Sequence, residues 1–198
     1  MQPALAIILA AIGATTLAGV ASAQTSDARR DFDVVATVPG GCTVSEPSQS
    51  PGAQVNFRGV NGNTLQIDQL TDATTLSTRA ASIELSFEAM CHSPHRLIIQ
   101  SQNNGLFPRS DRPIVPPAGF GTAVPYLAIA RWGTHNVRLE ANAHSRQSRD
   151  NWVTSEPHTG SILLSLQIEP GATNRRQNAP LLAGVYADTL RITLEPKQ

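Results

Sequence analysis

Two cysteines are the residues of this chain whose chemistry is easiest to place. Cys42 and Cys91 are the only two in the sequence, and the chain begins with the features of an export signal, described below. An even cysteine count in an exported chain favours one disulfide. The bridge would close a loop of about 50 residues, which the chain-entropy model values at roughly 4 kcal/mol. The alternative is a pair of unrelated buried thiols.

The other reactive side chains do not form a pattern that predicts an active site. His92 and His95 flank a turn, but no carboxylate pattern joins them and Cys91 is better used in the disulfide, so we expect no metal site and no cofactor. Glu84 and Glu88 share the outward face of one strand, which is more typical of a soluble surface than of a catalytic pair. The sequence contains no nucleophile elbow, phosphate loop or zinc helix motif. We therefore expect a protein that is not an enzyme.

Two tryptophans and one aspartate have alternative roles. Trp132 and Trp152 are of a type that stacks on sugars, but packing is the favoured interpretation, with one ring in the core and the other holding a loop. Asp188 interrupts the apolar positions of the last strand. We expect it to bond backbone amides at the entry of that strand rather than to do chemistry.

The first 23 residues carry no charged side chain, and residues 4–20 are almost wholly apolar or small. Ala21-Ser22-Ala23 matches the small-x-small pattern of signal peptidase sites, so we expect a secretory signal peptide over residues 1–23, cleaved after Ala23. The alternative is an uncleaved membrane anchor, although runs rich in Ala, Gly and Thr insert weakly. A formal net charge of zero, from 15 basic and 15 acidic side chains, does not suggest nucleic acid or an anionic membrane surface as partner.

Alternation of apolar and polar residues predicts strands through the rest of the chain. The clearest runs from Ser82 to Cys91, where Ile83, Leu85, Phe87, Ala89 and Cys91 share one face. We expect it to form a hairpin with 96–101, and 126–132 to pair with 136–141. Further strands are expected at 42–44, 55–57 and 161–169, with a short strand or hairpin in 59–72.

Polar and proline-rich stretches separate these strands and are expected to be loops, at 45–52, 108–125, 142–160 and 170–180. Helical periodicity does not persist anywhere after the signal sequence. Many short two-faced strands with Gly and Pro between them predict an all-β fold, an antiparallel β-sandwich.

Two strands at opposite ends of the exported chain have the same two-faced design. In the first, over 31–38, the apolar side chains Phe32, Val34, Ala36 and Val38 share a face. In the second, over 184–194, the shared face carries Tyr186, Leu190, Ile192 and Leu194. We expect the first strand to donate an apolar edge and the second to border a groove that receives one.

Three motifs in this order resemble the spore coat protein U domain family, the subunits of archaic chaperone–usher pili. The first is an alternating N-terminal strand followed by Gly41-Cys42-Thr43-Val44. The second is the strand 83–91 that ends in cysteine, followed by 97–101 and Asn104-Gly105. The third is the closing Gly-x-Tyr-x-Asp-Thr-Leu-x-Ile-Thr-Leu, at 184–194. The proline-rich loop 108–125 and the C-terminal Glu195-Pro196-Lys197-Gln198, which does not stop at an aromatic residue, depart from the family pattern.

The resemblance implies an immunoglobulin-like sandwich that lacks its last strand and is completed by donor-strand addition. Residues 24–41 would be a tail and donor strand, and 42–198 the pilin domain. The implied partners are a periplasmic chaperone, an outer-membrane usher and other pilus subunits, and the implied location is a surface fimbria reached through the periplasm. Burying the four donor side chains is worth roughly 6–12 kcal/mol before ordering costs. The alternative is a monomeric secreted binding module, a carbohydrate-binding adhesin using Trp152 and the loop 108–125.

Overall fold

The computed structural model describes residues 33–110, 115 and 117–197, without the side chains of 50–53. These residues form strands, turns and loops, and no helix. In the described part of the chain there is accordingly no helix long and apolar enough to cross a membrane. All the strands belong to the compact unit Val38–Gln198, and every pairing between them is antiparallel.

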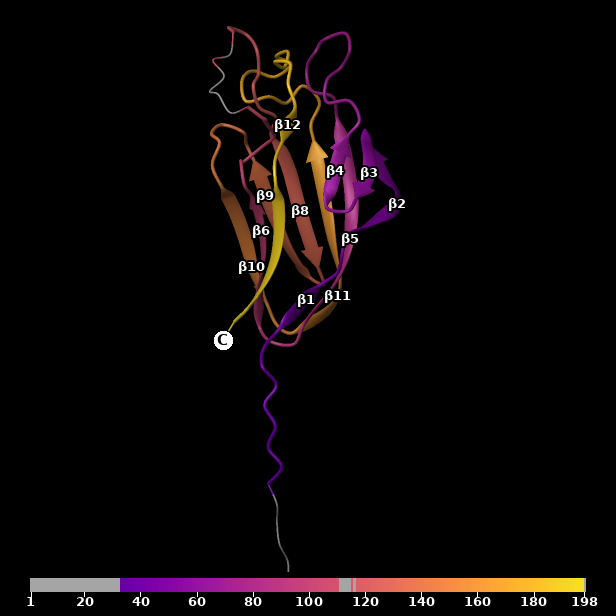
Figure 1. The fold of residues 1–198 in the computed structure, drawn as a ribbon, viewed down its shortest axis with the longest axis vertical. Coiled ribbons are helices and arrows are strands. Elements are labelled where there is room, and N and C mark those ends of the chain that lie inside the picture. The colour runs from indigo at the N-terminus through magenta and orange to yellow at the C-terminus, as the bar shows by residue number, and fades with distance from the viewer. Residues whose placement is uncertain (1–32, 111–114, 116, 198) are drawn as a thin grey trace, which may run out of the picture. The chain divides into compact units, whose positions relative to one another are not determined.

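Two sheets make up most of this unit (Figure 1). The larger has the order β1 (Cys42–Val44), β5 (Ala81–Cys91), β11 (His158–Ile168), β8 (Tyr126–Trp132) and β9 (His135–Ala141), with β2 (Ser48–Val55) also paired to β5. The smaller has the order β10 (Arg149–Ser155), β6 (His95–Ser101) and β13 (Leu190–Pro196). Two short pairs complete the fold, β3 (Phe57–Asn61) with β4 (Thr64–Ile67) and β7 (Phe107–Pro108) with β12 (Tyr186–Ala187).

The core consists of the inward side chains of both sheets. Alternate residues of β5, β6 and β8 are buried while their neighbours are partly or fully exposed, as expected for strands with one face on a core. The largest buried apolar side chains come from both sheets: Trp132, Ile83, Ile162 and Leu139 from one, Leu97 and Ile99 from the other. The sandwich expected from the sequence is therefore confirmed, as are the hairpins β8–β9 and β3–β4.

The expected hairpin between strands 82–91 and 96–101 is wrong. β5 pairs with β1, β2 and β11, whereas β6 pairs with β10 and β13, so the turn between them carries the chain from one sheet to the other. An alternating strand, a short turn and a second alternating strand look the same in sequence whether the two strands pair or face each other across a core.

Two of the expected loops are also wrong. Residues 48–55 form β2, an edge strand whose register against β5 shifts between Gln49 and Gln54, around Pro51 and Gly52. Edge strands and bulges are the places where a sheet tolerates proline. Residues 149–155 form β10. Its sequence shows no apolar alternation, because most of its side chains are polar and exposed and only Val153 and Ser155 turn inward. β11 also begins earlier than expected, at His158.

The predicted single last strand is divided into two. β12 ends at Ala187 and β13 begins at Leu190, with Asp188 and Thr189 between them. β12 pairs with β7, and β13 pairs with β6. Asp188 therefore lies where the chain leaves the short β7–β12 pair and enters the smaller sheet.

Candidate functional site

The candidate site is a groove beside β13, one of the two edge strands of the smaller sheet. β13 pairs with β6 on one edge, and no strand of the described chain pairs with its other edge. Leu190, Ile192 and Leu194 point toward the core but are only partly buried, whereas their cross-strand neighbours Ile99 and Leu97 on β6 are fully buried. The predicted parity of the last strand is therefore right, and the side chains on that face lack cover.

An open cavity of about 750 Å³ lies at the start of this strand. The β3–β4 hairpin forms one wall and the segment from Gly184 to Leu190 forms the other. Of the predicted groove residues, Tyr186 and Leu190 line the cavity, while Ile192 and Leu194 lie further along β13 and pack against the core. The apolar lining comes from both sheets and from the hairpin, and includes Phe57, Leu65, Ile67, Leu70, Leu106, Leu166 and Ile168.

The edge of β1 borders the same side of the domain. β1 is three residues long, pairs only with β5, and contacts β13 without pairing to it. Two neighbouring strands, one from each sheet, thus each leave one edge free among the described residues. Unpaired sheet edges present rows of backbone N–H and C=O groups that can accept another strand.

Asp188 is the centre of a hydrogen-bonded cluster at the rim of the cavity. Its Oδ2 accepts bonds from Ser101 Oγ at 2.5 Å, Tyr126 OH at 2.7 Å and the Gly105 amide at 3.3 Å. Its Oδ1 accepts from the amides of Asn103 at 2.9 Å and Thr189 at 2.7 Å. The expectation that Asp188 bonds backbone amides at the strand entry is confirmed.

Sequence reasoning missed the partners in this cluster. Ser101 and Asn104 are fully buried polar residues, and Asn104 binds the polar loop after β9 through Asn142. Asn104 also adopts a positive φ of 57°, which suits asparagine better than most residues. The Asn104-Gly105 turn motif was therefore the sequence signal that could have located this cluster.

Both tyrosines of the chain lie at the cavity and have raised pKa values. Burial, with a further contribution from the negative charge of Asp188, raises the pKa of Tyr126 far above its ordinary value of 10.0. Burial alone raises the pKa of Tyr186, whose hydroxyl donates to the Leu182 carbonyl at 2.7 Å. Both phenols are therefore held in their neutral form.

These pKa shifts predict a loss of stability in alkali. Above pH 10.0 the unfolded chain loses its tyrosine protons while the folded chain keeps them, so the free energy of unfolding falls as pH rises. We expect the urea midpoint to fall between pH 8 and about pH 11, and Tyr126→Phe to remove most of that fall. The phenylalanine variant should itself be less stable at pH 8 by about 1–2 kcal/mol, because the bond to Asp188 is lost. A pH dependence equal to that of the parent would contradict this assignment, and Tyr186→Phe serves as the comparison with the smaller expected effect.

The predicted donor segment forms no strand in its described part, residues 33–38. Val34 is 94% exposed, and Ala36 and Val38 are also exposed; Phe32 lies outside the described residues. A strand needs a partner edge, so a segment without one in the single chain remains unpaired. Three apolar positions of the predicted donor are therefore open to solvent.

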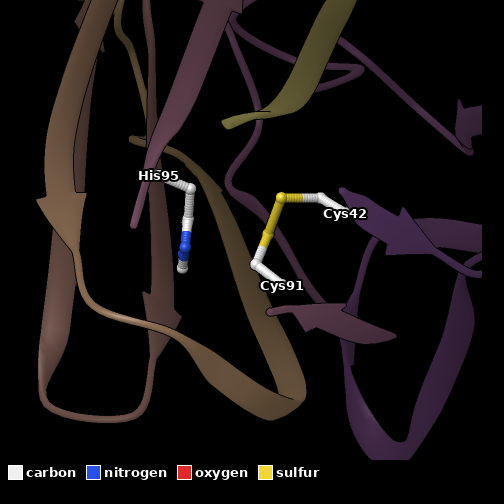
Figure 2. Close-up of side chains that lie close together, drawn as sticks. All are labelled: Cys42, Cys91 and His95. Atoms are coloured by element: carbon white, nitrogen blue, oxygen red, sulfur yellow. A yellow bond between two sulfur atoms is a disulfide. The ribbon is translucent and has the colours of Figure 1, made fainter. Parts of the chain in front are cut away.

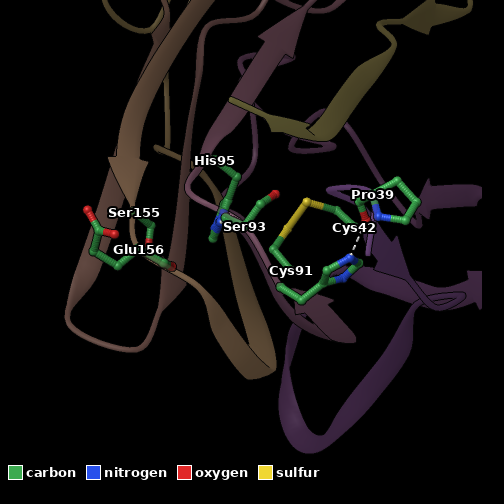
Figure 3. Close-up of a disulfide and its surroundings, with 8 residues drawn as sticks. Pro39, Cys42, Cys91, Ser93, His95, Ser155 and Glu156 are labelled. Carbon is green, nitrogen blue, oxygen red and sulfur yellow. Dashed lines mark hydrogen bonds between the residues drawn. A yellow bond between two sulfur atoms is a disulfide. The ribbon is translucent and has the colours of Figure 1, made fainter. Parts of the chain in front are cut away.

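The remaining predicted residues fall into separate places. Cys42 and Cys91 form the expected disulfide across the β1–β5 pair (Figure 3). Trp132 is buried in the core, as expected, and its Nε1 donates to the Gly160 carbonyl at 3.1 Å. Trp152 does not hold a loop: it is 51% exposed on the outer face of β10, with the Arg96 guanidinium 4.8 Å from its ring centre.

The two strand carboxylates have separate partners. Glu84 lies 3.5 Å from the Arg131 guanidinium, and Glu88 accepts a bond from Ser161 Oγ at 2.6 Å. Both are at least partly exposed on the outer face of β5. Nothing in this geometry joins them into one site, which fits their interpretation as a soluble surface.

No known protein family model matches this chain, and no curated protein matches it. The features of the chain that bear on its function are therefore the groove, the free strand edges and the exposed N-terminal segment.

Proposed function

We propose that this chain is a structural subunit of a bacterial surface pilus, assembled by a chaperone–usher pathway through donor-strand exchange. The observation that supports this most is β13, whose apolar face is incompletely covered and whose outer edge pairs with no strand of the described chain. Addition of a strand to such an edge is a recurrent mode of recognition, known from chaperone–pilin complexes. Main-chain bonds then supply affinity, and alternate side chains fill the groove.

The proposed occupant of the groove is the N-terminal segment of another copy or of a related subunit. Val34, Ala36 and Val38 alternate with Val35 and Thr37, so as a strand this segment turns three apolar side chains to one side. In the single chain these side chains are exposed. Together with Phe32, they supply roughly 6–12 kcal/mol of apolar burial before the costs of association and ordering, and the main-chain bonds of the added strand contribute as well.

The proposed partners are those that would keep an open groove from pairing with the wrong strand. A subunit with free edges and half-exposed apolar side chains is prone to pair with the wrong strand. A periplasmic chaperone that lends a strand would protect the subunit, and an outer-membrane usher would exchange that strand for the donor of the next subunit. The assembled fibre lies on the cell surface.

One observation favours a second candidate, a monomeric carbohydrate-binding module. Trp152 is half-exposed on the outer face of the smaller sheet, beside Ile98 in the register and Arg96 across its ring. Exposed aromatic rings of this kind are typical anchors in binding sites. Such a module would remain a monomer, so the state of assembly distinguishes the two candidates.

The test is the size of the exported protein on denaturing gels. If donor-strand exchange operates, unheated samples show a ladder of multiples of the subunit, and boiling reduces the ladder to one band without any reductant. The ladder must persist after free thiols are blocked, since the joint is not covalent. A single monomer band in unheated material isolated from the cell surface would overturn the proposal and favour the binding module.

A further inference from the structure

His95 lies in the core beside the disulfide, and its surroundings are unusual for a histidine. It is the first residue of β6 and is 0% exposed. Its ring packs against the Trp132 indole in a tilted arrangement, with ring centres 4.8 Å apart and ring planes at 50°. Figure 2 shows the ring next to the Cys42–Cys91 bridge. Water therefore has no direct access to this imidazole.

One nitrogen of this ring has no hydrogen-bond partner. Nδ1 lies 3.0 Å from the carbonyl oxygen of Ser93, which can only accept, so Nδ1 carries the proton and donates. Nε2 then presents a free lone pair, and it is buried without a partner. A buried polar atom without a partner is destabilising and calls for an explanation.

The two sulfurs supply that explanation when they are reduced. Cys42 and Cys91 are directly opposed in the β1–β5 register, with Cα atoms 4.2 Å apart. A ring nitrogen of His95 and both sulfurs lie within 4.8 Å of one another. Ligands of a tetrahedral zinc ion lie roughly 3.5–3.8 Å apart, because each is about 2.0–2.3 Å from the metal. Opening the sulfur–sulfur bond moves the sulfurs toward that separation, and β1 is a short edge strand that can shift with them.

We propose that the reduced chain binds a divalent cation of the zinc type through the thiolates of Cys42 and Cys91 and Nε2 of His95. A two-electron reductant first converts the disulfide to two thiols. The cation then displaces one proton from each thiol to solvent, giving two thiolates, a neutral imidazole and a site of zero net charge. Oxidation by a small-molecule disulfide restores the protein disulfide and releases the cation, so the site exists only in the reduced state.

The hydrogen bond that Nδ1 of His95 makes favours this role. Metal-binding histidines almost always donate their other ring N–H to a carbonyl or carboxylate, which fixes the tautomer and the direction of the ring. The Nδ1 bond to the Ser93 carbonyl is of this kind. Ser93 lies near His95 and the bridge in Figure 3, and its hydroxyl is also buried without a partner. In a site with three protein ligands, a water takes the fourth position.

His92 provides a matched control. It follows Cys91 directly in the sequence, yet it is exposed and its Nε2 pairs with the Pro39 carbonyl at 2.6 Å. The structure thus predicts that only the histidine four residues after Cys91, and not its immediate neighbour, belongs to the site.

The experiment titrates Co²⁺ into full-length exported protein reduced with a phosphine. The expected result is one equivalent bound, with thiolate-to-cobalt charge-transfer absorption and the visible bands of tetrahedral cobalt, both removed by Zn²⁺. His95→Gln should weaken binding at least tenfold, since even the loss of a supporting hydrogen bond at such sites costs 10–100-fold. His92→Gln should bind like the parent, and the oxidised protein should give no charge-transfer band.

Equal binding by the parent and His95→Gln, or equal loss in His92→Gln and His95→Gln, would overturn the proposal. If reduction unfolds the chain, the readout becomes refolding followed by far-ultraviolet circular dichroism. Zn²⁺ should then restore the β spectrum of the parent and of His92→Gln but not that of His95→Gln. Failure of Zn²⁺ to restore the reduced parent would also overturn it. None of these outcomes depends on strand exchange between subunits.

Discussion

Replacement of Asp188 by alanine is expected to lower the free energy of unfolding by roughly 3 kcal/mol or more, a large part of the stability of a typical domain. Its carboxylate accepts bonds from two hydroxyls and three backbone amides. Each hydrogen bond to a charged group is worth about 1.5–3 kcal/mol, although such values do not add. The alanine leaves Tyr126 and Ser101, both buried, without their acceptor. Urea unfolding at neutral pH measures the loss.

Asp188→Asn tests whether the acceptor chemistry, rather than the shape of the side chain, is responsible. The amide oxygen still accepts from Asn103 and Thr189, and the two hydroxyls can rotate to accept from the new NH₂ group. The Gly105 amide cannot rotate and loses its partner. We therefore expect a loss roughly half that of alanine. Asp150→Ala, an exposed aspartate on β10, should change stability by less than about 0.5 kcal/mol. A similarly small effect of Asp188→Ala would refute the structural role of the cluster.

Asp188 also shows why the sequence predicted some parts of the site and not others. Its position among apolar residues marked it as unusual, and its local role at a strand entry could be inferred. Its partners could not, because Tyr126 is 62 residues away and Ser101 is 87 residues away in sequence. No period or spacing connects residues that only the packing of the two sheets brings together.

The fold was predictable where one face of a strand is buried and the other wet. β5 has that contrast, and its buried face was predicted correctly. β8 and β11 have it too, and both were predicted as strands. β2 and β10 lack it, because one is a bulged edge strand and the other turns mostly polar residues outward. The turn between β5 and β6 was predicted as a hairpin, since alternation fixes which way a side chain faces but not which strand lies alongside.

For the groove, the sequence predicted only which side chains of β13 share a face. Alternation places Leu190, Ile192 and Leu194 on one face, and the structure agrees. That these side chains remain only partly buried depends on the absence of a neighbouring strand in the described chain, which is a property of topology. The β3–β4 hairpin that forms the opposite wall of the cavity carried only a weak alternating signal at Leu65 and Ile67.

Val34→Asp is expected to abolish the ladder of assembled subunits, provided that the proposed donor-strand exchange is the mode of assembly. Val34 is 94% exposed in the single chain, so the substitution should change the free energy of unfolding of the free subunit by less than about 0.5 kcal/mol. In the assembled fibre the same side chain would enter an apolar groove, where an unpaired carboxylate costs several kcal/mol. That cost is comparable to the roughly 6–12 kcal/mol supplied by the whole apolar face of the donor.

Thr37→Asp is the matched control, because it introduces the same charge three residues away on the opposite face of the segment. It should assemble like the parent on unheated gels. Deletion of residues 24–38 should give a subunit that folds and accepts a chaperone strand but cannot donate to another subunit. Polymerisation of Val34→Asp and of the deletion variant at the level of the parent would exclude this segment as the donor.

A mixing experiment separates failure to donate from failure to accept. Leu190→Glu places a charge in the cavity that receives the donor, while its own N-terminal segment is unchanged. Arg191→Glu, exposed on the other face of β13, is its control. Neither Val34→Asp nor Leu190→Glu should polymerise alone. Mixed, they should form pairs and no larger species, because the intact donor of Leu190→Glu enters the intact groove of Val34→Asp and the pair has no further functional end. A full ladder from the mixture, or no pairs from two folded variants, would show that the N-terminal segment and the β13 groove are not the two halves of one joint.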